Sequence, residues 1–225
     1  MRFRASRRKR FSVALSAALA GAVLAPTAAW AGGLVSPTIT APLDSAIITT
    51  SPLTVTADSP ATFVRFELGV GPIDSDTPSV TAGVASGSLE VYGVNGLVTI
   101  TAADCAAGPT CGAAGDSVQV DVNLPTPSIT SPQAKDYVRN SVDVKASAPG
   151  GTLQYSLDGN SVGSPVTAPF DKMISLTGKL DGQHTISVQQ CNAAGDHCEG
   201  KQASVTVIKD TRAPRWSNVT ASNKT

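Results

Sequence analysis

The chain has 225 residues, of which 17 are basic and 17 are acidic. Six of the basic residues lie within the first ten positions, so residues 32–225 hold 11 basic against 17 acidic residues, a net charge of −6. A net-negative chain without a basic stripe argues against nucleic acid or an anionic membrane surface as its partner.

The first 31 residues have the parts of a secretory signal peptide. Basic residues between Arg2 and Arg10 precede an apolar run from Phe11 to Ala25, and small residues follow at Ala29 and Ala31. This order is typical of a cleaved leader, and the apolar run is too short to span a bilayer. We expect cleavage after Ala31, no membrane insertion of the mature chain, and a product that is secreted or associated with the cell surface.

Beyond the leader the sequence repeats itself. Residues 36–42 return 90 positions later as residues 126–132, and Cys105 returns 86 positions later as Cys191. A nearly constant offset over the whole length indicates tandem duplication of one module.

Within each copy, runs of alternating residues predict β-strands. Leu53, Val55 and Ala57 are expected to face one side, and Thr54 and Thr56 the other. This period of two directs one set of side chains into a core and the other into water. About seven such runs per copy, separated by turn residues, are typical of a sandwich. The predicted fold class is all-β, with two tandem immunoglobulin-like antiparallel β-sandwiches.

The cysteine pairs occupy the same place in both copies, between two β-patterned runs. Four cysteines allow three pairings, but the duplication selects the two local ones, and cysteines of an exported protein are normally oxidised. We therefore expect each pair to form a disulfide that closes the tip of a hairpin. The pairs are Cys105 with Cys111 and Cys191 with Cys198.

The second copy resembles the bacterial Ig-like domains that occur in tandem in many secreted and surface proteins. The resemblance rests on four segments, which are residues 127–132 (PSITSP), 155–159 (YSLDG), 180–188 (LDGQHTISV) and 205–207 (VTV). It implies the sandwich fold, but members of this family serve as spacers, stalks, adhesin segments and accessory modules of enzymes. The first copy departs from the pattern between Gly69 and Gly87, where we expect a lengthened or irregular loop.

These patterns divide the chain into four parts. The parts are a signal peptide over residues 1–31, one sandwich over residues 32–125, a second over residues 126–210, and a tail over residues 211–225. The tail is either a short extension or the first strand of a truncated further repeat. Pro125 and Pro127 are expected to give a short, stiff linker.

Few residues suggest chemistry. Cys191, His197 and Cys198 offer an alternative metal site, but the first copy has no histidine and a fourth ligand is not evident. Asp74 and Asp76 are interpreted as polar loop residues rather than as a calcium or acid–base site. Neither histidine lies in a pattern with a nucleophilic serine and an acid. We predict no catalytic residue, no metal and no cofactor.

Exposed aromatic side chains, which sugar-binding surfaces usually need, are scarce. Tyr137 is expected to be the most exposed aromatic residue, and Trp216 is the one tryptophan beyond the leader. His184 is predicted at the surface or edge of a strand. The aromatic residues assigned to the core are Phe63, Phe66, Tyr155 and Phe170.

The sequence therefore favours a non-enzymatic secreted or cell-surface protein that acts as a structural spacer or adhesion module. The alternative is a carbohydrate- or protein-binding accessory module whose specificity lies in its loops. The predicted partners are a cell-wall glycan or another extracellular protein, and the chain is predicted to be a monomer.

Overall fold

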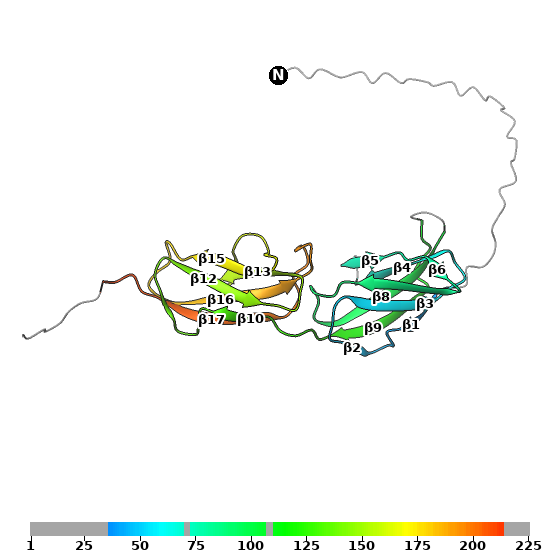
Figure 1. Ribbon diagram of the computed structural model, residues 1–225, viewed down its shortest axis with the longest axis horizontal. Helices are drawn as coiled ribbons and strands as arrows, with labels where there is room; N and C mark the ends of the chain where they lie inside the picture. The colour runs from blue at the N-terminus through cyan, green and yellow to red at the C-terminus, as the bar shows by residue number, and fades with distance from the viewer. Residues whose placement is uncertain (1–35, 70–72, 107–109, 214–225) are drawn as a thin grey trace, which may run out of the picture. The chain divides into compact units, whose positions relative to one another are not determined.

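The computed structural model describes residues 36–69, 73–106 and 110–213, all within one compact unit. The predicted signal peptide, Trp216 and most of the predicted tail lie outside the described residues. The described residues form two β-sandwiches that follow one another along the chain (Figure 1). None of them belongs to a helix that is long and apolar enough to cross a membrane.

The first sandwich consists of two sheets. One sheet has the strand order β1-β3-β7-β6 and the other the order β2-β9-β8-β4-β5. The strands are β1 (Thr38–Ala41), β2 (Ala46–Ile48), β3 (Leu53–Asp58), β4 (Phe63–Leu68), β5 (Asp74–Asp76), β6 (Val80–Thr81), β7 (Val84–Leu89), β8 (Gly96–Cys105) and β9 (Asp116–Val122).

The second sandwich also has two sheets, with the orders β10-β12-β15 and β11-β17-β16-β13-β14. Its strands are β10 (Ser128–Ser131), β11 (Tyr137–Val138), β12 (Ser141–Ser147), β13 (Thr152–Leu157), β14 (Asn160–Ser161), β15 (Asp171–Ser175), β16 (Gly182–Cys191) and β17 (Gln202–Lys209).

The two sandwiches share one topology. β1 pairs antiparallel with β3, and β10 pairs antiparallel with β12. After a proline, Pro42 or Pro132, the chain crosses to the other sheet, where β2 pairs parallel with β9 and β11 with β17. Proline cannot donate a hydrogen bond to a strand ladder, so it divides the first strand of each sandwich in two. This division is one reason why the structure has more strands than the sequence predicts. The shared order is that of an immunoglobulin-like sandwich, which confirms the predicted fold class.

Each sandwich has its own core, built by the expected alternation. β3 buries Val55 and Ala57, while β13 buries Leu153 and Leu157. Fully burying such aliphatic side chains stabilises a fold by about 1.5–3 kcal/mol each before entropy is subtracted. The predicted core aromatics are buried, except for Phe63, which is half-buried. The fully or largely buried ones are Phe66, Tyr155 and Phe170.

The region between Gly69 and Gly87 is more regular than the sequence suggests. Its described part contains β5, β6 and the start of β7. Ala82 (φ 52°) and Gly83 (φ 83°) make a tight turn between β6 and β7. The irregular alternative is therefore wrong for residues 73–87, but the connection from β4 to β5, over residues 69–73, is longer than the Asp158–Gly159 connection from β13 to β14. The short strands are stabilised by pairing with β4 and β7, and a local pattern of two or three residues does not reveal such pairing.

The Asp158–Gly159 pair forms the turn between β13 and β14. Asp158 (φ 53°) and Gly159 (φ 78°) both have the positive φ that a type I′ turn requires. The carboxylate of Asp158 lies 3.0 Å from His184 Nδ1 and 3.2 Å from Lys179 Nζ. Burial raises the pKa of Asp158, but hydrogen bonds from His184, from the Thr185 N–H and from Lys179 outweigh it and lower the pKa overall.

This turn changes the position expected for His184. Only 11% of its side chain is exposed, because Nδ1 contacts Asp158 and Nε2 lies 2.9 Å from the main-chain oxygen of Leu180. The edge position is therefore wrong, because β16 lies between β17 and β13, whereas the residue is half-buried at the surface of the sheet. His184 connects the turn after β13 to the loop before β16.

Candidate functional site at the joint between the sandwiches

Each sandwich carries one cysteine loop at the end of its β8–β9 or β16–β17 hairpin. The sulfur atoms of Cys105 and Cys111 lie at bonding distance, and so do those of Cys191 and Cys198. The two thiols of the alternative metal site are thus engaged with each other. Within residues 36–69, 73–106 and 110–213, no group of three or more His, Cys, Asp or Glu side chains is placed to bind a metal ion.

The second loop is organised by Asn192. Its side-chain oxygen accepts hydrogen bonds from three consecutive main-chain N–H groups, those of Gly195, Asp196 and His197. Its amide nitrogen also donates to the Asp196 carboxylate at 2.8 Å. Ala106 occupies the corresponding place in the first copy and has no such group. No predicted feature of the sequence included this residue, although asparagine often organises local turns.

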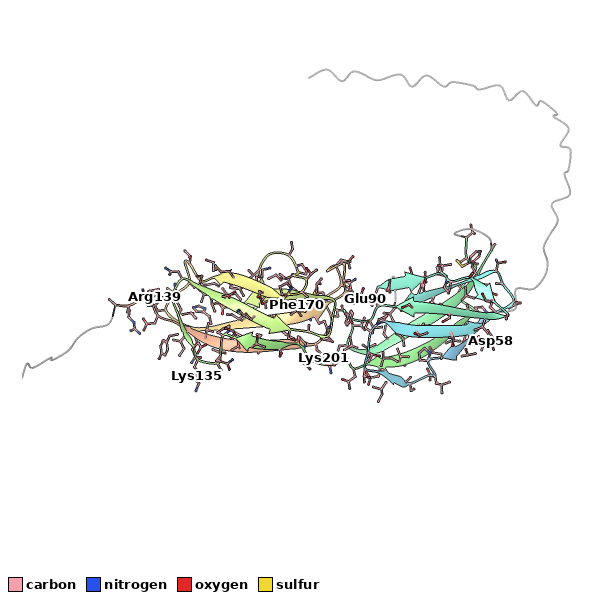
Figure 2. The ribbon with its side chains drawn as sticks, viewed as in Figure 1. Asp58, Glu90, Lys135, Arg139, Phe170 and Lys201 are labelled. Atoms are coloured by element: carbon pink, nitrogen blue, oxygen red, sulfur yellow. A yellow bond between two sulfur atoms is a disulfide. The ribbon has the colours of Figure 1, made fainter. Side chains whose placement is uncertain are left out.

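The second loop contacts the first sandwich directly. The Ala193 N–H donates to Glu90 Oε1 at 2.6 Å, and the Glu199 N–H donates to the Gly93 oxygen at 2.9 Å. Figure 2 labels Glu90 and Lys201, which come from the two sides of this joint. The Lys201 ammonium beyond the loop donates to the side-chain oxygen of Asn123.

Glycine allows the two backbones to approach at the joint. A Cβ atom at Gly93 would clash with the main-chain oxygen of His197 and the nitrogen of Asn192. Gly150 likewise lies against the ring of Tyr92, whose hydroxyl donates to the Ser51 oxygen at 3.1 Å. Such contacts leave no space for a larger residue. The joint is therefore packed as well as hydrogen-bonded.

Asp74 and Asp76 lie in β5 rather than in the predicted loop. The Asp74 carboxylate accepts the N–H of Glu90 at 2.5 Å, and the Asp76 carboxylate accepts the N–H of Ser88 at 2.8 Å. Both carboxylates thus bind main-chain donors at the end of β7. Their role here is to position the strand end that carries Glu90.

The pKa of Glu90 is shifted by its surroundings at the joint. Burial raises the pKa of Glu90, while the hydrogen bond from Ala193 lowers it and the nearby charges of Asp74 and Asp196 raise it. The net effect is a pKa above that of an ordinary glutamate. Ionised Glu90 is therefore disfavoured in the docked joint compared with the same group in water.

A groove of about 610 Å³ lies beside the joint. Apolar side chains come from the first sandwich, and charged ones come from residues 196–199 of the second. His197 Nε2 lies 3.6 Å from a Glu199 carboxylate oxygen. A lining of this mixed kind suits a small polar ligand. The lining residues are Gly69, Ile73, Val94, Asn95, Leu97, Val98, Thr99, Asp196, His197 and Glu199.

The remaining candidates lie away from the groove. Tyr137 is 74% exposed, as predicted, and lies on β11. Leu180, in the loop before β16, is another exposed apolar side chain. The sequence could not indicate the groove, because its lining comes from segments about 100 residues apart that have no pattern in common.

Similarity to known proteins agrees with this architecture. Residues 125–188 match the family described as bacterial Ig domain. No curated protein is significantly similar to the chain.

Several solved structures are similar at low identity. The fibronectin(III)-like modules of CbhA from Clostridium thermocellum are 19% identical, with a TM-score of 0.32, over 81% of this chain and 100% of that chain. The I9–I11 tandem from titin is 11% identical, with a TM-score of 0.36, over 77% of this chain and 65% of that one.

A putative membrane anchored protein from Corynebacterium diphtheriae is 14% identical, with a TM-score of 0.32, and the alignment covers 81% of this chain. This chain spans only 55% of that protein's structure. At these TM-scores the fold rests on the strand order described above. The strand order of both sandwiches is immunoglobulin-like, and residues 125–188, in the second sandwich, are similar to the bacterial Ig domain family.

Proposed function

We propose that the chain is a non-enzymatic spacer, exported from the cell, that holds its two Ig-like sandwiches in a fixed mutual orientation. The observation that carries the proposal is the joint. Main-chain donors of one sandwich bind acceptors of the other at Glu90 and Gly93. Domains in one chain move relative to each other by default unless their interface restrains them. A spacer that transmits position needs such a restraint.

The short connection supports the same function. The first core ends at Leu124, and β10 starts at Ser128. Pro125 and Pro127 lie between them, and proline restricts the backbone. The connection and the joint therefore act together to limit bending.

The test is to measure the orientation of the sandwiches in the exported chain by NMR. If the chain is a rigid spacer, residual dipolar couplings from both sandwiches will fit one alignment tensor, and nitrogen relaxation will give both the same rotational correlation time. Two different tensors, with shorter and unequal correlation times, would contradict the proposal.

The groove beside the joint favours a second candidate function, binding of a cell-wall glycan or of a peptide from another extracellular protein. Its lining combines the 70% exposed Leu97 with hydrogen-bonding groups on Asn95 and Asp196. A panel of cell-wall fragments and glycans tests it. A ligand with micromolar affinity that is weakened by Asn95→Ala and not by Ser161→Ala, on the distant β14, would establish this function instead. The spacer proposal predicts no saturable binding.

A further inference from the structure

We infer that the two cysteine loops have different roles. The loop closed by Cys191 and Cys198 is the docking element that fixes the second sandwich to the first, whereas the loop closed by Cys105 and Cys111 serves its own hairpin. This inference rests on the proposed spacer function, and it adds the element that makes the joint rigid.

The two donors that cross the joint lie next to the cysteines of the second loop. Ala193 lies two residues after Cys191, and Glu199 directly follows Cys198. The Cys191–Cys198 bond therefore fixes the spacing between these two N–H groups. Their acceptors, Glu90 Oε1 and the Gly93 oxygen, lie three residues apart on one short segment of the first sandwich. The spacing of donors and acceptors has to match for both bonds to form.

The loop between Cys191 and Cys198 is ordered by its own hydrogen bonds. Asn192 binds three of the main-chain N–H groups between the cysteines, and its own N–H donates to the His197 oxygen at 3.0 Å. The Thr152 hydroxyl donates to the Asn192 oxygen at 2.8 Å and ties the loop to β13. A loop that is ordered before it docks loses less conformational entropy on docking. The disulfide and Asn192 thus both favour the joint.

The first loop shows none of this organisation in its described part. The Ala106 N–H donates to the Thr110 oxygen, and the Gly112 N–H donates to the Asp104 oxygen. Both bonds stay within the β8–β9 hairpin of the first sandwich. This loop is the natural control, since its cysteines are separated by 6 positions against 7 in the second loop.

The experiment compares Cys191→Ser/Cys198→Ser with the matched variant Cys105→Ser/Cys111→Ser in the exported chain. Hydrogen exchange is measured at the Ala193 and Glu199 amides, and residual dipolar couplings are measured for both sandwiches. We expect the first variant to speed exchange at these two amides by about tenfold or more and to require two alignment tensors. The second variant is expected to leave both readouts at wild-type values.

Asn192→Ala covers the case in which the first variant fails to fold, because it disorders the loop and keeps the disulfide. It should also speed exchange at Ala193 and Glu199. Unchanged amides and one tensor in these variants would overturn the inference while leaving the rigid spacer intact. An equal effect of both cysteine variants would overturn it too. Two tensors in the wild-type chain would instead reject the spacer function itself.

Discussion

The Glu90 carboxylate of the first sandwich accepts a hydrogen bond from the Ala193 N–H of the second at 2.6 Å. This bond joins two domains through an ionisable acceptor that is partly removed from water. Burial is the largest influence on the acceptor and raises its pKa, and Asp74 and Asp196 add to the increase. The stability of the joint should therefore depend on pH.

The sign follows from the raised pKa. Protonated Glu90 suits the docked joint better than the charged form, so its stabilising contribution is complete below the ordinary glutamate pKa of 4.5 and is lost as pH rises through the raised value. We predict slower exchange of the Ala193 amide, corrected for intrinsic rates, at pH 4.5 than at pH 7. Glu90→Gln should remove this dependence, since glutamine is neutral at both pH values. A joint that tightens as pH rises would contradict the assignment.

The close approach at Gly93 gives a prediction that involves no titration. In Gly93→Ala the new methyl group clashes with the His197 oxygen and the Asn192 nitrogen. Both are backbone atoms, so no side-chain rotation can relieve the clash. We expect the two sandwiches to separate at this point and to give independent rotational correlation times, while both stay folded. The measurement is nitrogen relaxation together with circular dichroism.

Gly178→Ala is the matched control for this substitution. Nothing lies within 4 Å of a Cβ atom at Gly178, which has a φ of 80°. The control therefore has a local backbone cost on the order of 1 kcal/mol and no effect on the orientation of the sandwiches. If Gly93→Ala leaves one common correlation time, the joint is not packed as described.

The comparison of sequence with structure shows which features are local. Alternation at Leu53, Val55 and Ala57 is a nearest-neighbour property, so it predicts the strand and its buried face. The duplication predicts the shared topology because both copies repeat the same local patterns in the same order. The docking of Ala193 on Glu90 joins residues 103 positions apart. Its donor is a main-chain N–H, which every residue except proline has.

Other errors of the sequence analysis have the same origin. Nothing near Asp74 indicates that its carboxylate binds the N–H of Glu90, and nothing near His184 indicates that Asp158 covers it. Each contact depends on how strands distant in the sequence meet. Asn192 is different, because it binds residues three to five positions ahead. A search for asparagine at the start of a loop could have found it.

The pairing of the cysteines remains to be measured. We predict that a non-reducing digest shows Cys105 bonded to Cys111 and Cys191 bonded to Cys198 by mass spectrometry. Reduction should lower the melting temperature by several degrees and keep the β-type circular dichroism. The reason is that a small-loop disulfide contributes about 2 kcal/mol, whereas a domain of this size has roughly 5–15 kcal/mol of net stability. A bond between Cys105 and Cys191, or complete unfolding on reduction, would refute this prediction.

The core of the second sandwich gives a prediction about Tyr155. Its hydroxyl donates a hydrogen bond to the main-chain oxygen of Phe170, and the whole side chain is buried. Tyr155→Phe leaves that oxygen without its donor, so we expect a loss of about 1–3 kcal/mol in the free energy of unfolding. Tyr137→Phe, at an exposed site, should change it by less than about 0.5 kcal/mol. Denaturant unfolding measures both changes in the free energy of unfolding. Hydrogen exchange in β13 and β16 then shows whether the loss lies in the second sandwich.

The same residue determines how the second sandwich responds to alkali. Burial, and then the charge of Asp171, raise the pKa of Tyr155 from 10.0 to about 12. A raised pKa in the folded state means that the neutral phenol stabilises the fold fully below pH 10, and that this contribution is lost as pH rises through about 12. Wild-type protein should therefore lose stability over this interval more steeply than Tyr155→Phe, which has no phenol to ionise. Parallel pH profiles for the two proteins would show that Tyr155 ionises as freely in the folded sandwich as in the unfolded chain.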